Sequence, residues 1–387
     1  MFIRLRTVTE LSKKDQLYAL IRANPFISQQ DLAQELGLSR SAVAGHIAGL
    51  IRERRLLGRA YVLADRRPVV CIGAANLDRK LRSTGPLQMG TSNPARQDES
   101  FGGVARNIAE NLARLGAPVG LVTAVGSDAS GAALLAHAEG AGIDTRGSLR
   151  LGGSYSGTYT AILDQQGDML LALADMALYD QLTPEFIARV QPQRAGAALT
   201  VADLNLPHDT VRALLDDAAR DSVPLVVVAV SQPKMDRLPL DLTGLRLLIL
   251  NQGELETRTG KPISGDADLA AACAAVQAQG AQDIIVTRGA GGVSFTTANG
   301  IAHLPALAAN VVDVTGAGDS FAAAVCWTLY QGGSDLAQAC RRGLHLSSMT
   351  VACAETVSPA LAPDSLDAID ALFSTPGEQP FNALYKD

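Results

Sequence analysis

The residues with the clearest chemical potential lie at 311–321, where the sequence reads Val-Val-Asp-Val-Thr-Gly-Ala-Gly-Asp-Ser-Phe and leads into an apolar helical stretch. Gly316, Ala317 and Gly318 are small residues at a predicted helix start. They would expose consecutive backbone N–H groups at the positive end of the helix dipole, an arrangement that suits phosphate. Asp319 follows directly and is placed to remove a proton from a hydroxyl that attacks this phosphate. The alternative is a glycine-rich turn in which Asp319 only caps the helix.

The elements that must position this segment follow an alternating pattern from residue 68 onward. Apolar strand runs are expected at 69–73, 119–125, 198–202, 225–230, 245–250 and 283–287, and helices at 105–115, 130–140, 208–220, 267–279 and 319–331. Strands that alternate with helices of this length predict right-handed β-α-β units and a mainly parallel sheet. A turn at 164–168 predicts a β-hairpin within 151–175, which would form a small lid together with strands near 76–100. Ligands are expected at the strand-end loops of such a sheet.

The segment 311–321 closely resembles the second signature of the PfkB-type carbohydrate kinases, also called the ribokinase family. Residues 102–109, Gly-Gly-Val-Ala-Arg-Asn-Ile-Ala, are similar to the first signature of that family, a Gly-Gly turn with asparagine four residues later. Together with three elements described below, these motifs follow the family order across nearly all of 69–360. The resemblance implies an α/β ribokinase-like sandwich with a mainly parallel central sheet and a small β lid. It also implies an ATP-dependent kinase that phosphorylates an alcohol.

The resemblance assigns the sugar side of the site to the first signature and to the segment before it. Gly102 and Gly103 would let the backbone approach a sugar, and Asn107 would hydrogen-bond its hydroxyls. The run Gly-Ala-Ala-Asn-Leu-Asp at 73–78 resembles a strand end of the family, whose acidic residue, here Asp78, grips vicinal hydroxyls. Two neighbours of these residues, Asn76 and Arg106, complete this part of the substrate-binding set.

The nucleotide side rests on two further elements of the family. Asn251-Gln-Gly-Glu254 matches its Asn-x-x-Glu element, in which Glu254 would help to organise Mg²⁺ through water and Asn251 would lie near the nucleotide phosphates. Thr287 begins a turn, Thr-Arg-Gly-Ala-Gly-Gly, that matches the Thr-x-Gly turn holding ATP, with Gly289 and Gly291 in it. The chain has no Gly-x-x-x-x-Gly-Lys-[Ser/Thr] motif, so Mg·ATP would be held by strand-end loops rather than by a P-loop.

The family also suggests a monovalent cation and a reaction course. Many members bind a cation such as K⁺ beside the anion hole, and Asp313 and the Thr315 carbonyl lie where it would be. The mechanism implied is direct in-line transfer, in which Asp319 takes the proton of a primary hydroxyl while the N–H groups of 316–318 stabilise the moving phosphoryl group. Closure of the lid would exclude water during this step.

Within the family, the closest likeness is to pseudouridine kinases, which implies transfer to the 5′-hydroxyl of a ribonucleoside. Ser92 and Asn93 before the first signature and Asp175 after the hairpin belong to this likeness, and Asn93 and Asp175 are candidates to bind a pyrimidine ring. The alternative for each is ordinary turn polarity. Three alanines depart from related kinases, namely Ala174 and Ala177 where asparagine is frequent, and Ala229 where aspartate is frequent. Uridine, inosine and ribose therefore remain alternative substrates.

The net charge of −6 is distributed unevenly along the chain. Residues 1–67 contain 12 basic and 6 acidic residues, a net charge of +6, whereas residues 68–387 contain 21 and 33, a net charge of −12. An asymmetry of this kind favours a nucleic-acid-facing module joined to a second domain. We therefore expect a first domain at 1–67 and a kinase domain at 68–387, with the join near 64–68.

Three helices and a small hairpin are predicted in the first domain. Ser12, Ser28 and Ser39 can each cap a helix with an apolar face, and Gly37 supplies the left-handed residue between the second and third helices. Residues 56–63 form an apolar stretch around a Gly-Arg turn, which predicts a hairpin or wing. The pattern resembles the winged helix-turn-helix domains of bacterial regulators.

This resemblance implies a DNA-binding surface. The third helix would present Ser39, Arg40, Ser41 and His46 to a major groove, and Arg59 on the wing would contact phosphates. The alternative is a small helical module that packs on a partner, with solvated basic residues. A second functional alternative is a transcription regulator that uses a kinase fold as a ligand sensor. The presence of Asp319 and the other motif residues favours an enzyme.

The composition limits the cellular compartments and the partners that are expected for this chain. The five cysteines form no Cys-x-x-Cys pair, which argues against a disulfide framework or a structural zinc site and indicates the reducing cytoplasm. Apolar runs such as 223–230 are far too short to span a bilayer, so no membrane partner is expected. A homodimer is expected for two reasons, since operators are often palindromic and the lid edges of this kinase family commonly pair.

Overall fold

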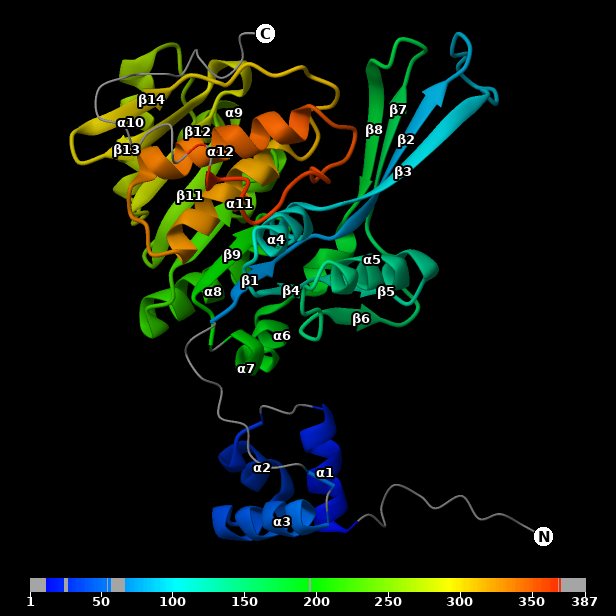
Figure 1. The fold of residues 1–387 in the computed structure, drawn as a ribbon, viewed down its shortest axis with the longest axis vertical. Coiled ribbons are helices and arrows are strands. Elements are labelled where there is room, and N and C mark those ends of the chain that lie inside the picture. The colour runs from blue at the N-terminus through cyan, green and yellow to red at the C-terminus, as the bar shows by residue number, and fades with distance from the viewer. Residues whose placement is uncertain are drawn as a thin grey trace. The chain divides into compact units, whose positions relative to one another are not determined.

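The structure is a computed structural model that describes residues 12–23, 27–53, 55–56, 67–194, 196–367 and 369. The chain divides into two compact units, Met1–Arg66 and Arg67–Asp387, which we call the N-terminal unit and the C-terminal unit (Figure 1). Among the described residues, no helix is both long enough and apolar enough to cross a membrane.

The N-terminal unit contains the three expected helices, α1 (Lys13–Ala23), α2 (Gln29–Leu36) and α3 (Arg40–Arg52). The hydroxyl of Ser28 accepts the N–H of Asp31 at 3.1 Å and caps α2, and the hydroxyl of Ser39 accepts the N–H of Ala42 at 3.2 Å and caps α3. Gly37 ends α2 with a φ of 61°, in the left-handed region that glycine adopts without strain. The predicted helices and their caps are therefore confirmed.

A small apolar core holds these helices together. It is formed by buried apolar residues of all three helices: Leu17, Leu32, Ala33, Leu36, Val43, Ile47 and Leu50. Residues 24–26, between α1 and α2, lie outside the described residues. Of the predicted wing, residues 57–63, including Arg59, lie outside them as well.

The C-terminal unit is built on one large, mainly parallel sheet. All four residues of β1 and all five of β9 are buried, which is typical of strands covered on both faces. The sheet is parallel from β4 to β12, and β13 and β14 add an antiparallel edge. In sheet order, its strands are β14 (Gly300–Leu304), β13 (Val293–Thr297), β12 (Asp283–Thr287), β11 (Leu245–Asn251), β10 (Leu225–Val228), β9 (Leu199–Asp203), β1 (Val69–Ile72) and β4 (Val119–Val122).

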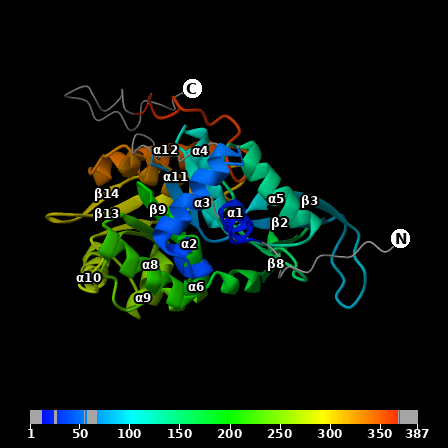
Figure 2. The ribbon, with the colours of Figure 1, turned by 90° about the horizontal axis from the view of Figure 1, so that it is seen from below.

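Helices cover both faces of this sheet (Figure 2). One face carries α4 (Val104–Arg114), α5 (Ala129–Gly140), α11 (Ala317–Tyr330) and α12 (Leu336–Val351), and the other carries α6 (Pro184–Arg189), α8 (His208–Asp221), α9 (Gln252–Thr259) and α10 (Asp266–Gln277), with the short α7 (Gln191–Arg194) following α6. Two separate apolar cores result, one on each side of the sheet. The expected α/β sandwich is confirmed.

A second sheet forms the lid. It has the strand order β3 (Ala95–Gly102), β2 (Asn76–Ser83), β7 (Thr158–Leu163) and β8 (Met169–Asp175). Figure 1 shows these strands extending from the core as a long arm. The first residues of β2 and β7 and the last residues of β3 and β8 lie at the base of the lid, so the lid side chains nearest to the core come from four strand ends.

One predicted strand differs from the structure. The run 119–125 divides into β4 and β5 (Ala124–Gly126), because β5 leaves the large sheet and pairs with β6 (Leu149–Leu151). Thr123 lies between the two strands and is fully buried. An unbroken apolar run carries no signal for this change of partner, since both strands are buried.

Candidate active site

The start of α11 depends on a glycine. Gly316 is the N-cap of the helix and has a φ of 82°. A Cβ at this position would collide with the carbonyl oxygen of Thr356. Only glycine both adopts this positive φ without strain and leaves room for the Thr356 carbonyl. The segment after α12, which contains Thr356, therefore limits the path of the chain into α11.

The first turn of α11 has backbone N–H groups without an acceptor inside the helix. The N–H of Ser320 donates to the carbonyl of Gly316 at 2.9 Å, and the N–H of Ala317 lies at 3.3 Å from the carbonyl of Val314. The N–H groups of Gly318 and Asp319 come before the helical hydrogen-bond ladder and have no acceptor within the helix. They lie at the positive end of the helix dipole, where an anion is stabilised.

Asp319 is the titratable group nearest to this cradle. Its carboxylate accepts a hydrogen bond from Asn107 Nδ2 at 2.7 Å, because α4 packs directly against α11. The pKa of Asp319 is raised to about 7, mainly by burial; the hydrogen bond from Asn107 and the charge of Arg106 oppose this shift, and the charges of Asp203 and Asp78 contribute to it. A carboxylate with a pKa near neutrality is suited to exchange a proton with a hydroxyl.

Asp78 provides a second buried carboxylate at the base of the lid. Its Oδ1 accepts a hydrogen bond from Asn76 Nδ2, and burial raises its pKa to about 6. A Cβ on Gly102 would collide with this carboxylate, so the glycine of the β3 end permits the close approach. The structure therefore brings together the predicted residues Asn76, Asp78 and Gly102.

Asp203 joins three segments around the cleft. Its fully buried carboxylate accepts the N–H groups of Ala74 at 2.9 Å, Ala105 at 3.0 Å and Asn205 at 2.8 Å. Burial raises the pKa of Asp203, whereas these N–H groups lower it. A Cβ on Gly73 would collide with the same carboxylate. The ends of β1 and β9 and the start of α4 are thus held by one side chain.

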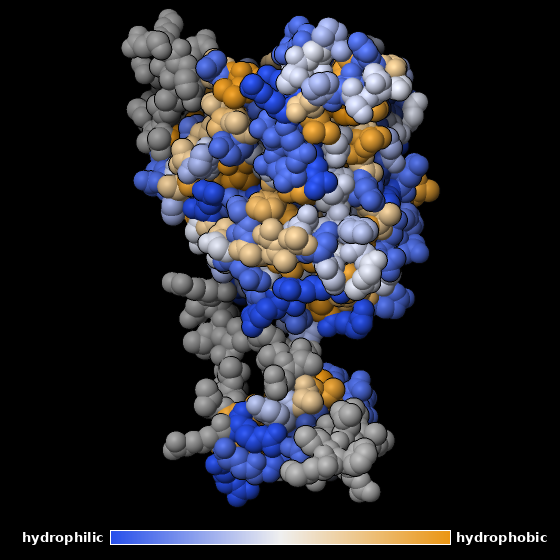
Figure 3. Space-filling model, turned by 90° about the vertical axis from the view of Figure 1, so that its right-hand side faces the viewer, coloured by the Kyte–Doolittle hydropathy of each residue, from blue (hydrophilic) through white to orange (hydrophobic). Residues whose placement is uncertain are grey.

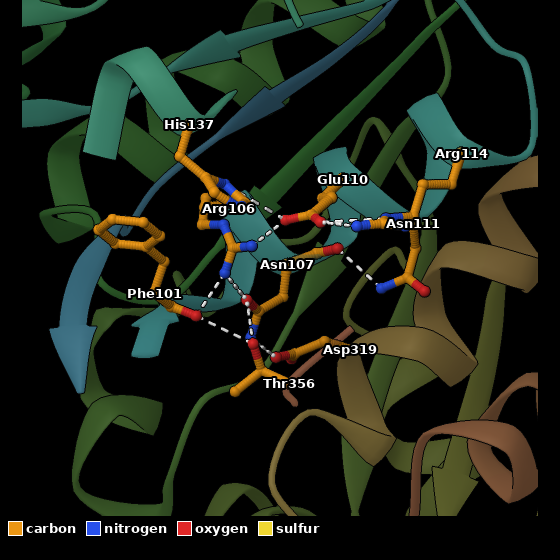
Figure 4. A network of polar contacts seen from close by, with 9 residues as sticks. All are labelled: Phe101, Arg106, Asn107, Glu110, Asn111, Arg114, His137, Asp319 and Thr356. Atoms are coloured by element: carbon orange, nitrogen blue, oxygen red, sulfur yellow. Dashed lines mark hydrogen bonds and ion pairs between the residues drawn. The ribbon is translucent and has the colours of Figure 1, made fainter. Parts of the chain in front are cut away.

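Arg106 has several hydrogen-bond partners within the protein. Its side chain is buried, and its guanidinium donates to the carbonyl of Phe101, to Oδ1 of Asn107 at 2.8 Å and to Glu110 (Figure 4). These partners lie on α4 and just before it. The direct contact of Arg106 with substrate stays a prediction.

The two lid residues predicted before the first signature lie far along the lid. Ser92 and Asn93 belong to the turn between β2 and β3, at the end of the lid away from the core (Figure 1). Asn93 Oδ1 accepts the N–H of Gln88 at 2.7 Å, and its Nδ2 donates to the carbonyls of Gln88 and Thr91 at 3.0 and 3.1 Å. The amide of Asn93 is thus used within the turn, which fits the turn alternative. Asp175 lies at the lid base, in register with Thr158.

The predicted nucleotide elements meet at neighbouring strand ends. Asn251 at the end of β11 is in register with Thr287 at the end of β12. After Thr287, the chain turns through Gly289, which has a φ of 55°, and Gly291 before β13 begins. Adjacent carboxyl ends of parallel strands are the expected location for phosphates in such a sheet.

Asn251 and Glu254 also form a reciprocal cap for α9. Asn251 Oδ1 accepts the N–H of Glu254 at 2.9 Å, and Glu254 Oε2 accepts the N–H of Asn251 at 2.7 Å. Glu254 is buried, which raises its pKa. The Asn-x-x-Glu spacing therefore has a structural role as a capping box in addition to any role at the nucleotide.

The carboxylate of Asp313 is already engaged. Its Oδ1 accepts the N–H and the hydroxyl of Thr315 at 2.9 and 2.7 Å, and its Oδ2 accepts Lys80 Nζ from the lid strand β2. The lysine lowers the pKa of Asp313, although burial acts in the opposite direction. An ammonium group thus occupies the side of the carboxylate where a monovalent cation was expected.

Comparison with known proteins agrees with the site geometry. Residues 66–363 match the family model for pfkB family carbohydrate kinases. A pseudouridine kinase of Escherichia coli is 35% identical over 76% of this chain and 93% of its own length. An uncharacterized sugar kinase of the same organism, YeiI, is 32% identical over 92% of this chain and 97% of its own length. The chain belongs to the pfkB family of carbohydrate kinases.

Solved structures of pfkB kinases share the fold of the C-terminal unit. A putative sugar kinase from Clostridium perfringens superimposes with a TM-score of 0.69 and is 27% identical over 79% of this chain and 96% of its own. The ribokinase of Arabidopsis thaliana, solved with ribose and ATP, has a TM-score of 0.67 over 79% of this chain and 98% of its own, at 20% identity. At 20% identity, the similarity to the Arabidopsis ribokinase shows a shared fold only.

The N-terminal unit of this pfkB kinase is a winged helix-turn-helix domain, since residues 12–53 match a winged helix-turn-helix DNA-binding model. Ser39, Arg40 and Ser41 are exposed at the start of α3, and His46 is half-buried on the same helix. The hydroxyl of Ser39 is shared between its capping bond and Ser41 Oγ, 2.9 Å away. Arg59 lies outside the described residues.

Two residues of the kinase site were not predicted from the sequence as site residues. Asp203 and Thr356 act through contacts with segments remote in the chain. The signal that could have found Asp203 is a carboxylate at the end of a buried strand.

Proposed function

We propose that this protein transfers the γ-phosphoryl group of ATP to the 5′-hydroxyl of a ribonucleoside, with pseudouridine as the first candidate. The observation that carries the proposal is the position of Asp319. Its carboxylate, with a pKa raised to about 7, follows directly on the amide cradle at the start of α11. A base and an anion site within one helical turn are what transfer of phosphoryl to a hydroxyl requires.

The proposed chemistry uses these groups in one step. The 5′-hydroxyl oxygen attacks the γ-phosphorus as its proton passes to Asp319, and the bond to the bridging oxygen breaks so that ADP leaves. The N–H groups of Gly318 and Asp319, which have no acceptor within the helix, would stabilise charge on the transferred group, whereas the N–H of Ala317 already donates to Val314. Asp78 and Asn76, at the base of the lid, would hold the vicinal hydroxyls of the ribose.

The residues present fit a magnesium ion that arrives with the nucleotide. Glu254 Oε2 is used by the N–H of Asn251, which leaves Oε1 to face a hydrated ion. In the described part of the chain, no cluster of three or more His, Cys, Asp or Glu could hold a metal by itself. Mg²⁺ often binds through phosphates, waters and one carboxylate, and when bound it would neutralise charge on the phosphates.

The residues present do not fit a monovalent cation at Asp313. Both oxygens of that carboxylate have partners, and one partner is the ammonium of Lys80. We therefore assign no step to K⁺. The ion pair joins the lid to the segment that leads into the amide cradle, and it would favour the closed lid during transfer.

The 35% identity to a pseudouridine kinase over most of both chains supports a nucleoside over a simple sugar. Asp175 does not add to this support. It pairs with Thr158, the neighbour of the Tyr159 that pairs with Asp78, so strand alternation places Asp175 and Asp78 on opposite faces of the lid. We therefore assign the ring of the substrate no contact with Asp175.

A substrate panel tests the proposal. Purified protein with Mg·ATP is given pseudouridine, uridine, inosine and ribose, and the phosphorylated product is measured by mass spectrometry. We expect a kcat/KM for pseudouridine about tenfold or more above the values for uridine and ribose, because a site that hydrogen-bonds a ring discriminates against molecules that lack its partner. Equal values for all four compounds would contradict the nucleoside assignment, and no product at all would contradict the kinase assignment.

The winged helix-turn-helix domain supports a second function, binding to DNA. The exposed residues at the start of α3 and the net charge of +6 on residues 1–67 favour this function. A protein that both binds DNA and phosphorylates a nucleoside is compatible with the two separate units. A regulator without catalysis would differ from this proposal in showing no product in the substrate panel.

We further propose that two copies of the chain pair through their lids. Leu171 and Leu173 of the edge strand β8 are 51% and 59% exposed, and they share a lid face with Ile162. This face is opposite to the one that carries Lys80. On the side of the molecule that lies at the right in Figure 1, apolar patches interrupt the hydrophilic surface (Figure 3). An exposed apolar edge strand favours self-association. In a dimer with twofold symmetry, the same lid face of each copy would be covered by the other copy.

The molar mass in solution tests this pairing. The wild-type protein is expected to sediment at twice the mass of one chain, and the double variant Leu171→Asp/Leu173→Asp at the mass of one chain. Leu240→Asp changes an exposed leucine outside the lid and should leave the mass unchanged. A monomeric wild-type protein, or a dimeric double variant, would rule out the lid interface.

A further inference from the structure

Helix α4 carries a row of charges spaced four residues apart. Arg106, Glu110 and Arg114 lie on one helix face, and the first two are 3% and 2% exposed (Figure 4). Glu110 accepts hydrogen bonds from Arg106 on one oxygen and from Arg114 on the other, the latter at 2.8 and 3.0 Å. The row thus runs from the surface into the interior and ends beside Asn107.

Arg106 fixes the orientation of the Asn107 amide. A guanidinium can only donate hydrogen bonds, so the amide atom that faces Arg106 at 2.8 Å must be the oxygen. The Asn107 nitrogen then points the other way, where it donates to Asp319 at 2.7 Å. Thr356 Oγ1 lies 3.4 Å from the same amide oxygen and 2.9 Å from the carbonyl of Phe101, which also accepts from Arg106. Reversal of the amide would break the bonds on both sides.

The position of Arg106 is unfavourable for stability in three respects. It is in the first turn of α4, whose N-cap is Gly103, where the helix dipole disfavours a positive charge. It is buried, and desolvation lowers its pKa. Its Nε has no hydrogen-bond partner among the described residues. A buried, partly unsatisfied cation in this place requires an explanation beyond packing.

Charges of both signs surround this row. Asp78 and Asp319 act on Arg106 from the cleft, and Glu110 acts on it from α4. His137 of α5 lies 3.7 Å from Glu110, beside Arg114. Around Asp319 itself, Asp203 and Asp78 favour the protonated form, and Arg106 is the cation that favours the ionised form.

We propose that Arg106, held by Glu110, is a positioning residue that orients Asn107 and keeps Asp319 ready to accept a proton. Arg106 contacts neither substrate in this assignment and acts through the Asn107 amide and through its charge. The inference rests on the proposed kinase function and extends it by a role that was not expected from the sequence, which placed Arg106 on the substrate.

A double-mutant cycle tests the connection between Arg106 and Asn107. Arg106→Met and Asn107→Ala are each expected to lower kcat roughly 30-fold, the scale of a lost supporting hydrogen bond at a reacting group. The double variant should be no slower than Asn107→Ala within about threefold, because residues that act as a unit are not additive. Arg146→Met removes a surface arginine paired with Asp144 and should leave kcat unchanged.

The pH profile separates the charge of Arg106 from its hydrogen bonds. In Arg106→Met, the acid limb of kcat/KM should move to higher pH, since loss of the cation raises the pKa of Asp319. In Arg106→Lys, the charge remains and the limb should stay in place, but kcat should still fall because one nitrogen cannot replace the guanidinium fork. If Arg106 only stabilised the fold, the acid limb would stay in place in both variants. If Arg106→Met does not fold, Arg106→Lys takes its place in the cycle.

The outcomes distinguish this inference from the function on which it depends. Additive effects in the cycle, or an acid limb that stays in place in Arg106→Met, would overturn the positioning role while the kinase function stands. Full activity of Asp319→Asn would instead overturn the kinase function. Non-additivity together with a moved limb in the methionine variant alone would support the role of Arg106.

Discussion

Replacement of Asp319 by asparagine is expected to lower kcat by about 10³-fold, within the range for loss of a general base. The side chains are nearly equal in size, and the N–H groups at the start of α11 remain, so binding of ATP should change little. Asparagine cannot accept the proton of the attacking hydroxyl. The measurement is steady-state formation of ADP and of the phosphorylated nucleoside, with ATP affinity determined in parallel.

A matched control addresses the possibility that Asp319 is only a helix cap. Asp268 is also an acidic residue in a first helical turn, that of α10, and accepts the N–H of Ser264 at 3.0 Å. Asp268→Asn should cost at most about 1 kcal/mol of stability through the helix dipole and leave kcat unchanged. If Asp319→Asn behaves in the same way as Asp268→Asn, the catalytic interpretation of the carboxylate is wrong.

The same base predicts a pH dependence. The pKa of Asp319 is raised to about 7, and only the ionised form can accept a proton. The value of kcat/KM should therefore fall as the pH decreases through about 7, tenfold for each unit below it. Asp78, whose pKa is raised to about 6, would steepen the decrease further below that value. A profile that is flat from pH 5 to pH 8 would argue against Asp319 as the base.

Deletion of residues 1–66 is expected to abolish binding to duplex DNA. The full-length protein should bind with an affinity that falls steeply as salt concentration rises, because contacts of lysine and arginine with phosphates release counterions. The shortened chain, which retains only the acidic unit, should show no such binding. Fluorescence anisotropy with a labelled duplex at several salt concentrations measures both the affinity and its slope.

Point variants locate the surface within the first unit. Arg40→Ala removes an exposed arginine at the start of α3 and should weaken binding about tenfold. Arg150→Ala removes an exposed arginine from β6 in the other unit and serves as the control. Equal affinities for Arg40→Ala and Arg150→Ala would contradict recognition through α3, and undiminished binding by the shortened chain would contradict the charge argument.

Local signals in the sequence were sufficient for much of the fold. Capping residues and helical spacing act over three or four positions, so the caps at Ser28 and Ser39 and the left-handed Gly37 could be predicted. The signature around Asp319 is also local, since the amides and the carboxylate belong to one helical turn. For the same reason, the parallel strands could be located from their apolar runs.

Contacts between remote segments could not be predicted in this way. Lys80 and Asp313 are separated by 233 positions, and no residue next to either of them in the sequence indicates that the two will pair. The family resemblance suggested a monovalent cation beside Asp313, and in the structure this carboxylate pairs with Lys80 of the lid. Arg106 was assigned to the substrate because it lies in a signature, but its partners are set by the path of α4 and by burial.

The long sequence separation of the site contacts has a consequence for the synthesis of the protein. The bond from Asn107 to Asp319 spans 212 positions, and that from Thr356 to the carbonyl of Phe101 spans 255. During synthesis, the first signature leaves the ribosome long before its partners exist. Asp319 can meet Asn107 only after α11 has been translated, and the Thr356 contacts with Phe101 and Asn107 form only after the segment beyond α12 has followed. The complete set of site contacts therefore forms only when most of the kinase domain has left the ribosome.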